Sequence, residues 1–277
     1  MSAPQTSPRP SRLRQAVRIA LPPTLVFGVV LLLWYAGSEF LLSDRRQFLL
    51  PPPHEVVITC FGDQDNLQEL LQALGRSAWV AFLGLAIATL VGTGLAILMS
   101  QASWVERSLY PYAVALQTIP ILALVPLFGF WFGFGFESRV LVCVLIALFP
   151  IIANTLFGLR SVQQAHRDLF ALAQAGRLTR LIKLEFPSAL PSFFTGMRIS
   201  AGLSVIGAIV GDLFFRQGEP GIGVLMDLYR QRLQSEQLFG AVLLSSLLGI
   251  AVFWSFGFLA RRVVGRWHES GRDPTNS

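Results

Sequence analysis

The 277-residue sequence is poor in the side chains that enzymes use for catalysis and metal binding. Its single lysine, Lys183, is followed by Leu184, so the chain lacks the Gly-x-x-x-x-Gly-Lys-Ser/Thr loop that holds nucleotide phosphates. It contains no HExxH, no GxSxG and no paired acidic cluster suited to a catalytic metal. The histidines are scattered without metal-ligand spacing. We therefore expect no catalytic site, no metal and no cofactor in this chain.

Charge is also scarce, because only 14% of the residues are charged and 53% are hydrophobic, whereas an ordinary soluble domain has about 25% charged residues. Apolar runs are long enough to cross a hydrocarbon core of about 30 Å. The sequence therefore predicts an all-α membrane protein with six transmembrane helices. We place them at residues 19–42, 78–99, 110–134, 140–159, 191–215 and 238–260.

Two of these runs need comment. The first exceeds the apolar length of a signal peptide, about 7 to 15 residues, and no clear A-x-A site follows it, so we expect it to be retained. The third contains Pro111, Pro120 and Pro126. Membrane helices tolerate prolines where neighbouring helices satisfy the freed carbonyls, so we predict a single span there.

The distribution of basic residues predicts the orientation. With both termini in the cytoplasm, arginine and lysine favour the inner side by about two to one. Residues 1–18 are then a disordered cytoplasmic tail, 19–260 the transmembrane domain and 261–277 a second cytoplasmic tail. Residues 160–190 form an inner loop, while 43–77 and the glycine-rich stretch 216–237 lie outside. The +6 net charge reflects this topology in a lipid bilayer and does not indicate a nucleic-acid partner.

The fifth span carries two charges, Arg198 and Asp212, and charges within spans are functional hypotheses by default. They are about 21 Å apart along a helix, so they cannot pair directly. We expect Arg198 to reach the inner headgroups and Asp212 to face the bundle interior or the outer vestibule.

Small residues recur along the same span and permit close approach of another helix. They are Ser200, Ser204, Gly207, Ala208 and Gly211. Three interpretations stay open, namely packing within one subunit, a subunit interface, or a face that lines a path. This helix is our first choice for a path.

The inner loop is patterned as a short pair of amphipathic helices, of which the second carries a basic row. Leu178, Leu181 and Ile182 follow a helical period, and a basic row lies on another face. Such a helix could lie in the membrane interface or present its face to a partner protein. Pro187 is predicted to end it, and Pro191 to begin the next span.

The same segment resembles the signature loop of binding-protein-dependent ABC importer permeases, and most closely the nitrate/sulfonate/taurine branch. That loop reads Glu-Ala-Ala, three residues, Gly, and then about a dozen residues before Leu-Pro. The sequences FPSALP (186–191), TGMR (195–198), LPPP (50–53) and IPILALVPLFGFWFGFG (119–135) also fit this family, as do Asp212, Gly218, Gly221 and Gly223. Alignment on Pro187 places Asp168 at the family's Glu and Gln174 at its Gly, so this chain departs from the family pattern at both positions. The nearest glycine, Gly176, lies two residues after the position where the family has its own.

The resemblance implies a type I importer fold in the inner membrane, in a non-catalytic subunit that forms a homodimer with a second permease subunit. Two ATP-binding subunits would bind ATP and Mg²⁺ below it, and an extracytoplasmic binding protein would deliver an oxyanion, a sulfonate or a vitamin precursor. The implied coupling residues are Asp168, Gln174, Ala175, Gly176, Arg177, Leu178, Arg180, Leu181, Ile182 and Pro187. The implied path or gate residues are Arg198, Ser200, Ser204, Gly207, Gly211, Asp212 and Gly221. The alternative is an ion-coupled secondary transporter or a channel, which would need coupling charges or broken helices at the midplane.

Overall fold

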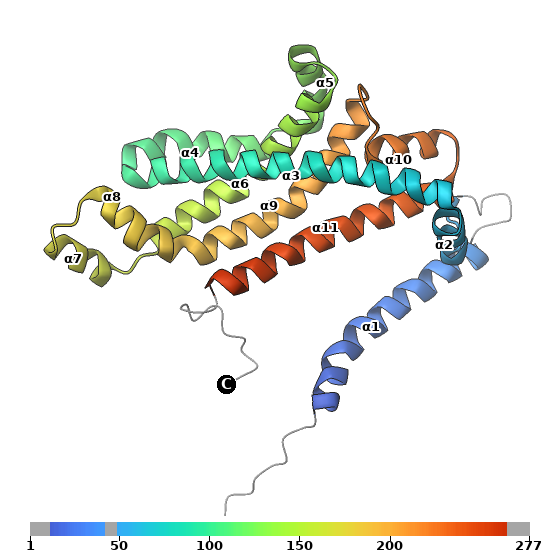
Figure 1. The fold of residues 1–277 in the computed structure, drawn as a ribbon, viewed down its shortest axis with the longest axis horizontal. Helices are drawn as coiled ribbons and strands as arrows, with labels where there is room; N and C mark the ends of the chain where they lie inside the picture. Colours follow the sequence, from blue (N-terminus) through green and yellow to red (C-terminus); the bar gives the residue numbers. More distant parts are fainter. Residues whose placement is uncertain (1–11, 42–48, 265–277) are drawn as a thin grey trace, which may run out of the picture.

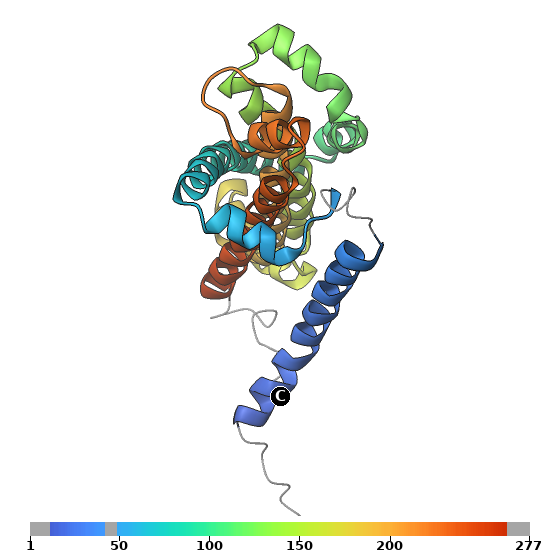
Figure 2. The same cartoon turned by 90° about the vertical axis from the view of Figure 1, so that its right-hand side faces the viewer.

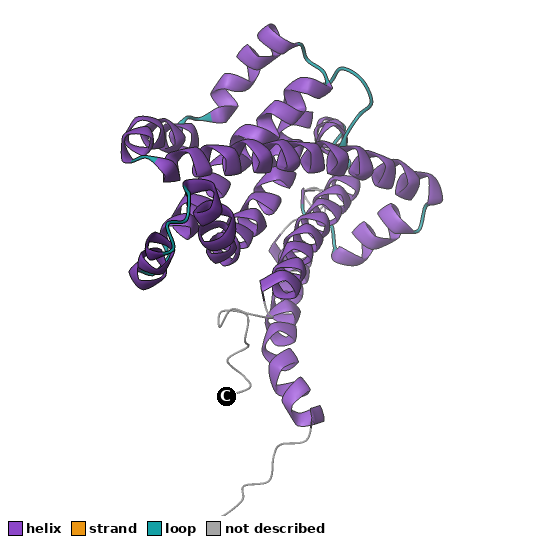
Figure 3. Cartoon of the chain, turned by 60° about the vertical axis from the view of Figure 1, so that its left-hand side comes forward, coloured by secondary structure: helices purple, strands orange, loops and turns teal. Residues whose placement is uncertain are grey.

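The computed structural model describes residues 12–41 and 49–264, and every regular element in this part of the chain is helical (Figure 3). Residues 1–11 and 265–277, which belong to the two predicted tails, lie outside the described residues. Helix α1 begins at Arg12 instead of Ile19, so the last residues assigned to the N-terminal tail belong to the first helix.

Four long helices form the centre of the molecule and run side by side (Figure 1). They are α3 (Gln64–Gln101), α6 (Phe136–Arg160), α9 (Phe186–Phe214) and α11 (Ser235–Val264). Their contacts are made by small and branched residues, among them the fully buried Ala88, Ala147, Ile151 and Ala201. All four are long and apolar enough to cross a membrane. The second, fourth, fifth and sixth predicted spans are therefore confirmed as helices, each longer than predicted.

Helix α1 (Arg12–Ala36), which continues as a π-helical turn at Gly37–Leu41, stands away from this bundle (Figure 2). Its C-terminal end is attached by three hydrogen bonds, one of them between Tyr35 Oη and His54 Nδ1 at 3.0 Å. Trp34 Nε1 donates to the carbonyl of Pro51 at 3.0 Å, and Ser38 Oγ donates to that of Leu50 at 2.8 Å. The stretch Leu21–Phe40 also qualifies as a span.

The third predicted span is not one continuous helix. The chain forms α4 (Ser103–Thr118) and α5 (Ile121–Phe132), which meet at a bend of 100° (Figure 1). The cause is Pro120, which has no N–H for the carbonyl of Leu116 and disfavours helical angles at the residue before it. Ile119 accordingly adopts extended angles, φ −66° and ψ 128°.

Both outer segments contain helices that the sequence did not reveal. Residues 43–77 include α2 (Pro53–Phe61) and the first turns of α3, and residues 216–237 include α10 (Ile222–Gln231). These elements pack with α11 around Val56, Leu70, Ile222 and Tyr229. This end of the bundle therefore has an apolar core of its own.

Pro187 does not end the inner helix, contrary to prediction. Helix α8 (Arg177–Arg180), a π-helical turn (Leu181–Glu185) and α9 follow one another without a break, so one helical rod runs from Arg177 to Phe214. Pro187 lies at the start of α9, just after the π turn, where the Phe186 N–H bonds the carbonyl of Leu181. A missing N–H is tolerated at such a place. Pro191 is therefore inside α9 and does not begin it.

Candidate functional site

The chain turns at Gln174, between α7 (Gln164–Leu172) and α8. The Gln174 N–H donates to the carbonyl of Ala171 at 2.9 Å, and the Ala175 N–H donates to that of Phe170 at 3.0 Å. This is a Schellman motif, whose turning residue adopts the left-handed conformation and is usually glycine. Gln174 has φ 51°, so the turn lies at the position where the resembling family keeps glycine. Gly176 has ordinary extended angles and precedes α8.

The hairpin of α7 and α8 lies at one end of the bundle (Figure 1). It exposes large apolar side chains. Leu172 is 82% exposed and Leu178 68% exposed, and Leu169 and Ile182 are exposed as well. We call these four residues the hairpin leucine-isoleucine set. Leu181 does not belong to it, because it packs against the main core. The predicted face of Leu178, Leu181 and Ile182 is therefore split between surface and core.

Charged residues of the hairpin region fall into two groups. Arg177 and Lys183 are exposed, and Asp168 accepts a hydrogen bond from Gln164 at 2.9 Å. Arg180, in contrast, is engaged with Glu185, whose Oε1 lies 2.9 Å from the Arg180 Nε although Glu185 is buried. Arg180 therefore forms an ion pair within the continuous helix that begins at Arg177 and does not extend a free basic row.

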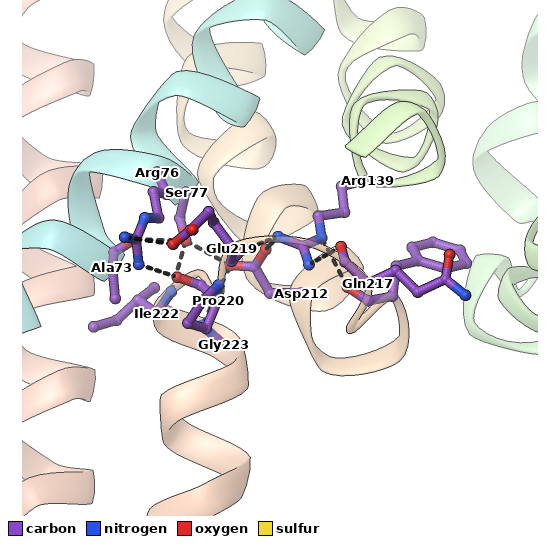
Figure 4. A network of polar contacts seen from close by, with 11 residues as sticks. Ala73, Arg76, Ser77, Arg139, Asp212, Gln217, Glu219, Pro220, Ile222 and Gly223 are labelled. Carbon is purple, nitrogen blue, oxygen red and sulfur yellow. Dashed lines mark hydrogen bonds and ion pairs between the residues drawn. The ribbon is translucent and has the colours of Figure 1, made fainter. Parts of the chain in front are cut away.

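At the opposite end, Asp212 lies at the centre of a buried polar network (Figure 4). Its side chain is fully buried. Ser77 Oγ on α3 donates to Asp212 Oδ2 at 2.5 Å, and the backbone N–H of Gly223 donates to the same oxygen at 3.3 Å. Arg139 Nη1 on α6 lies 3.4 Å from Oδ1. Asp212 thus faces the bundle interior, as predicted, and connects three long helices.

Arg139 and Ser77 are residues of this network that the sequence did not single out. The Arg139 guanidinium is buried and donates to three carbonyls of the loop after α9. These are Phe215 at 2.7 Å, Glu219 at 3.0 Å and Gln217 at 3.1 Å. A buried carboxylate such as that of Asp212 requires a cationic or hydrogen-bonding partner. This requirement is the signal that could have pointed to Arg139.

The glycine-rich stretch is shaped around the same network. A Cβ at Gly221 would overlap the Asp212 carboxylate, and one at Gly223 would overlap the carbonyl of Ile209. Arg76 also holds this loop, donating to the Pro220 carbonyl at 3.2 Å. Asp212 and Gly221, which the resemblance names only as path or gate residues, therefore lie against each other in the structure. We call Ser77, Arg139, Asp212 and the loop 215–223 the Arg139–Asp212 network.

The row of small residues on α9 packs against α6. Ser200 Oγ donates to the Ala147 carbonyl at 2.6 Å. A Cβ at Gly207 would lie 2.9 Å from Cys143 Cα, and one at Gly211 would lie 3.0 Å from Arg139 Cα. Ser204 is buried as well. Of the three interpretations, packing within one subunit describes this row, and the path-lining role expected of Ser200, Ser204, Gly207 and Gly211 has no support in their placement.

Another face of α9 borders an open apolar groove shared with α11. Its volume is about 670 Å³, and Ile199, Leu203, Ile206, Val242, Ile250 and Phe253 are among its lining residues. Arg198 lies next to it, exposed, with its Cζ 3.8 Å from the centre of the Phe253 ring. Within the described ranges, no three His, Cys, Asp or Glu side chains are placed to hold a metal ion.

These features define a multi-pass membrane protein. Five helices of the described chain are long and apolar enough to span a bilayer, and the bent pair α4 and α5 brings the number to six if it counts as one span. Residues 84–265 match the model of the binding-protein-dependent transport system inner membrane component family. The chain belongs to this family of ABC importer permeases, which are transport components of the inner membrane.

Individual relatives agree with this assignment. The chain is 35% identical over 234 residues to the formylaminopyrimidine transport permease protein ThiX of Halalkalibacterium halodurans, covering 84% of this chain and 91% of that protein. It is 32% identical over 252 residues to the riboflavin transport system permease protein RibX of Chloroflexus aurantiacus, covering 91% of each. It is 34% identical over 236 residues to a putative aliphatic sulfonates transport permease protein, SsuC, of Escherichia coli, covering 84% of this chain and 86% of the relative.

Proposed function

We propose that this chain forms the translocation path of an ATP-driven importer as one of two identical permease subunits. Two ATP-binding subunits, which hold ATP and Mg²⁺, bind at the α7–α8 hairpin, and an extracytoplasmic binding protein delivers the solute at the opposite end. The substrate is an oxyanion, a sulfonate or a vitamin precursor. The names of the relatives support this range, since they include formylaminopyrimidine, riboflavin and aliphatic sulfonates.

The observation that carries the proposal is the exposure of the hairpin leucine-isoleucine set. Leucines this exposed on a polar hairpin are typical of a face that a partner covers. The hairpin is also held rigidly, by the Schellman turn at Gln174, the Arg180–Glu185 ion pair and the burial of Leu181. A rigid element with an exposed apolar face suits docking to another subunit better than it suits lying in the membrane interface.

The placement of the charges supports the orientation with both termini in the cytoplasm. The exposed Arg177 and Lys183 lie on the hairpin, and cytoplasmic segments carry an excess of such residues. The Arg139–Asp212 network then lies at the outer end. We propose that it fixes the loop 215–223 in the conformation that meets the binding protein or closes the outer gate.

The path that we propose lies on a different side of α9 from the row of small residues. Because Ser200, Ser204, Gly207 and Gly211 face α6, we assign the path to the other side of α9, which carries Ile199, Gly202, Leu203 and Ile206 beside the open groove. Arg198 stands at the inner end of this side.

Charge substitution in the hairpin tests the proposal. Leu178→Asp places a carboxylate on the exposed apolar face, and Thr179→Asp, at the adjacent exposed position, is the matched control. Both variants are expected to insert normally. Leu178→Asp should lose co-purification of the ATPase subunit and ATP-driven uptake in proteoliposomes, while Thr179→Asp should retain most of both. Equal retention of the ATPase subunit by the two variants would show that α8 is not the docking element.

A further inference from the structure

One turn of the rod from Arg177 to Phe214 has a different helical geometry from the rest. Residues Leu181–Glu185 form a π turn, in which the Phe186 N–H bonds the carbonyl of Leu181. This bond spans one residue more than the corresponding bond of an α-helix, so the π turn holds one extra residue. If the same residues formed a plain α-helix, α8 would be rotated by about 100° around the axis of α9. The π turn therefore determines the direction in which α8 faces.

The π turn is also the place where the rod is anchored in the bundle. Helices α7 and α8 contain no buried residue. Within the π turn, in contrast, Leu184 and Glu185 are buried and Leu181 packs against the main core. Helix α7 also bonds the end of α6, where Arg167 Nη2 donates to the carbonyl of Arg160 at 3.3 Å, but this bond is exposed. The orientation of the hairpin therefore depends chiefly on the π turn.

An ion pair joins the residues on the two sides of this turn. Arg180 Nε lies 2.9 Å from Glu185 Oε1, across a separation of five residues. On an α-helix the side chains that meet are three or four residues apart, whereas residues five apart point about 140° away from each other. The π turn, with its extra residue, brings the two side chains together. The ion pair therefore favours the π turn over the α-helix.

Pro187 favours the π turn for a separate reason. In a plain α-helix its ring would clash with the carbonyl of Lys183, and it has no N–H to donate to that carbonyl. The proline therefore disfavours a regular helix at this point. The contribution of the ion pair can be measured by itself only after Pro187 has been replaced.

We propose that the π turn, held by the Arg180–Glu185 ion pair, sets the rotational position of the hairpin leucine-isoleucine set for docking to the ATPase subunit. This rests on the proposed function, in which the α7–α8 hairpin is the docking element. Arg180 and Glu185 are positioning residues, because they act through the direction of Leu178. Without the pair the turn becomes α-helical, and Leu178 is rotated by about 100° away from its docking position.

The test changes the number of residues in the turn, with Pro187→Ala as the reference variant. Deletion of Lys183 removes the extra residue, so that Arg180 and Glu185 become i and i+4 neighbours on a plain α-helix and Leu178 keeps its direction. Insertion of an alanine after Lys183 adds a further residue and rotates Leu178 by about 100°. Lys183→Ala removes the same exposed side chain at constant length and is the matched control.

Co-purification of the ATPase subunit and ATP-driven uptake in proteoliposomes are measured for each of these variants. We expect the Pro187→Ala reference, Lys183→Ala and the deletion to retain both activities, and the insertion to lose both. A plain α-helix would respond in the same way to a deletion and to an insertion, because each change rotates α8 by one residue. The difference between the two is therefore specific to a turn that holds an extra residue.

A second set of variants isolates the ion pair. Arg180→Met/Glu185→Leu, in the Pro187→Ala reference, removes both charges, and replacing a buried pair by apolar residues is often neutral or stabilising. We expect an unchanged or higher melting temperature together with loss of the ATPase subunit. Deletion of Lys183 from this variant should restore co-purification, because the shortened turn no longer needs π geometry. A direct contact between Arg180 and the partner could not be restored in this way.

Equal effects of the deletion and the insertion would overturn the proposal. Failure of the deletion to restore docking in Arg180→Met/Glu185→Leu would do the same, and so would loss of the ATPase subunit in the Pro187→Ala reference, which would assign the register to the proline. The deletion is expected to retain or recover docking, a result that unfolding cannot mimic. If the wild type co-purifies with its ATPase subunit, these outcomes refute the positioning role alone. If it does not, the proposed function itself fails.

Discussion

The buried ion pair of Arg139 and Asp212 leads to a prediction in which one substitution has opposite effects in two backgrounds. In the wild type, Asp212→Asn removes the negative charge next to a buried guanidinium. In the Arg139→Leu variant, the same substitution removes a buried carboxylate that has lost its cation. We therefore expect Asp212→Asn to destabilise the wild type and to stabilise the Arg139→Leu variant.

The contacts in the structure determine how large the loss of stability should be. Removing one partner of a buried ion pair costs about 3–5 kcal/mol, because the other charge stays buried without compensation. Arg139→Leu also removes the hydrogen bonds to the carbonyls of Phe215, Gln217 and Glu219. Asp212→Asn alone costs less, because the guanidinium keeps these carbonyls and an Asn side chain can still accept from Ser77. For a chain of this size, about 2–4 °C of melting temperature corresponds to 1 kcal/mol, so Arg139→Leu should lower it by roughly 10 °C.

Thermal unfolding in detergent, followed by fluorescence-detected size-exclusion chromatography, measures all four proteins of this cycle. Arg76→Leu is a suitable control, since Arg76 is partly exposed and forms its ion pair with the exposed Glu219. It should shift the melting temperature far less than Arg139→Leu. If Asp212→Asn lowers the melting temperature equally in both backgrounds, the two charges are not coupled and the network is not held by its ion pair.

Two further predictions concern single positions. Gln174→Gly should raise the melting temperature, since it relieves a left-handed conformation that costs a non-glycine residue about 1–2 kcal/mol, and Gln174→Val should lower it in the same assay. Asp227 on α10 has a pKa held below its ordinary value of 3.8, chiefly by the hydrogen bond from Arg230. Its stabilisation is therefore complete above that value and is lost as the pH falls below it, so the wild type should lose more stability than Asp227→Asn in acid denaturation at pH values below about 4.

Most of the helices could be predicted because hydropathy is a property of long runs. The limits of α3, α6, α9 and α11 shifted, but their existence followed from about 20 apolar residues in sequence. Prolines were harder, because the same residue bends a helix at Pro120 and is accommodated at Pro187. What differs is the neighbouring backbone, extended at Ile119 and π-helical before Pro187. Neither state is encoded in the proline itself.

The functional residues were predicted unevenly for a similar reason. Asp212 and Gly221 were found because a buried charge and a glycine-rich loop are local signals. Arg139 was missed because its partner lies far along the chain, on a different helix. Leu181 was assigned to the same face as Leu178 because an α-helical period was assumed throughout. The π turn that begins at Leu181 changes this period, and Leu181 packs against the core instead.

The unbroken helix from Arg177 to Phe214 changes how the two ends of the bundle are related. A corner at Pro187 would have separated the proposed docking hairpin from the helix to which we assign the path, and force on the hairpin could then be absorbed by bending. Instead, 38 residues form one rod of about 57 Å, with the exposed Leu178 near one end and Asp212 near the other. Because the Arg139–Asp212 network fixes the outer end of this rod to α3 and α6, a displacement of α8 has to tilt α9 together with both helices, or break the network. The hairpin and the outer loop are therefore mechanically linked through a single helix, and the stability of the Arg139–Asp212 network sets how rigid that link is.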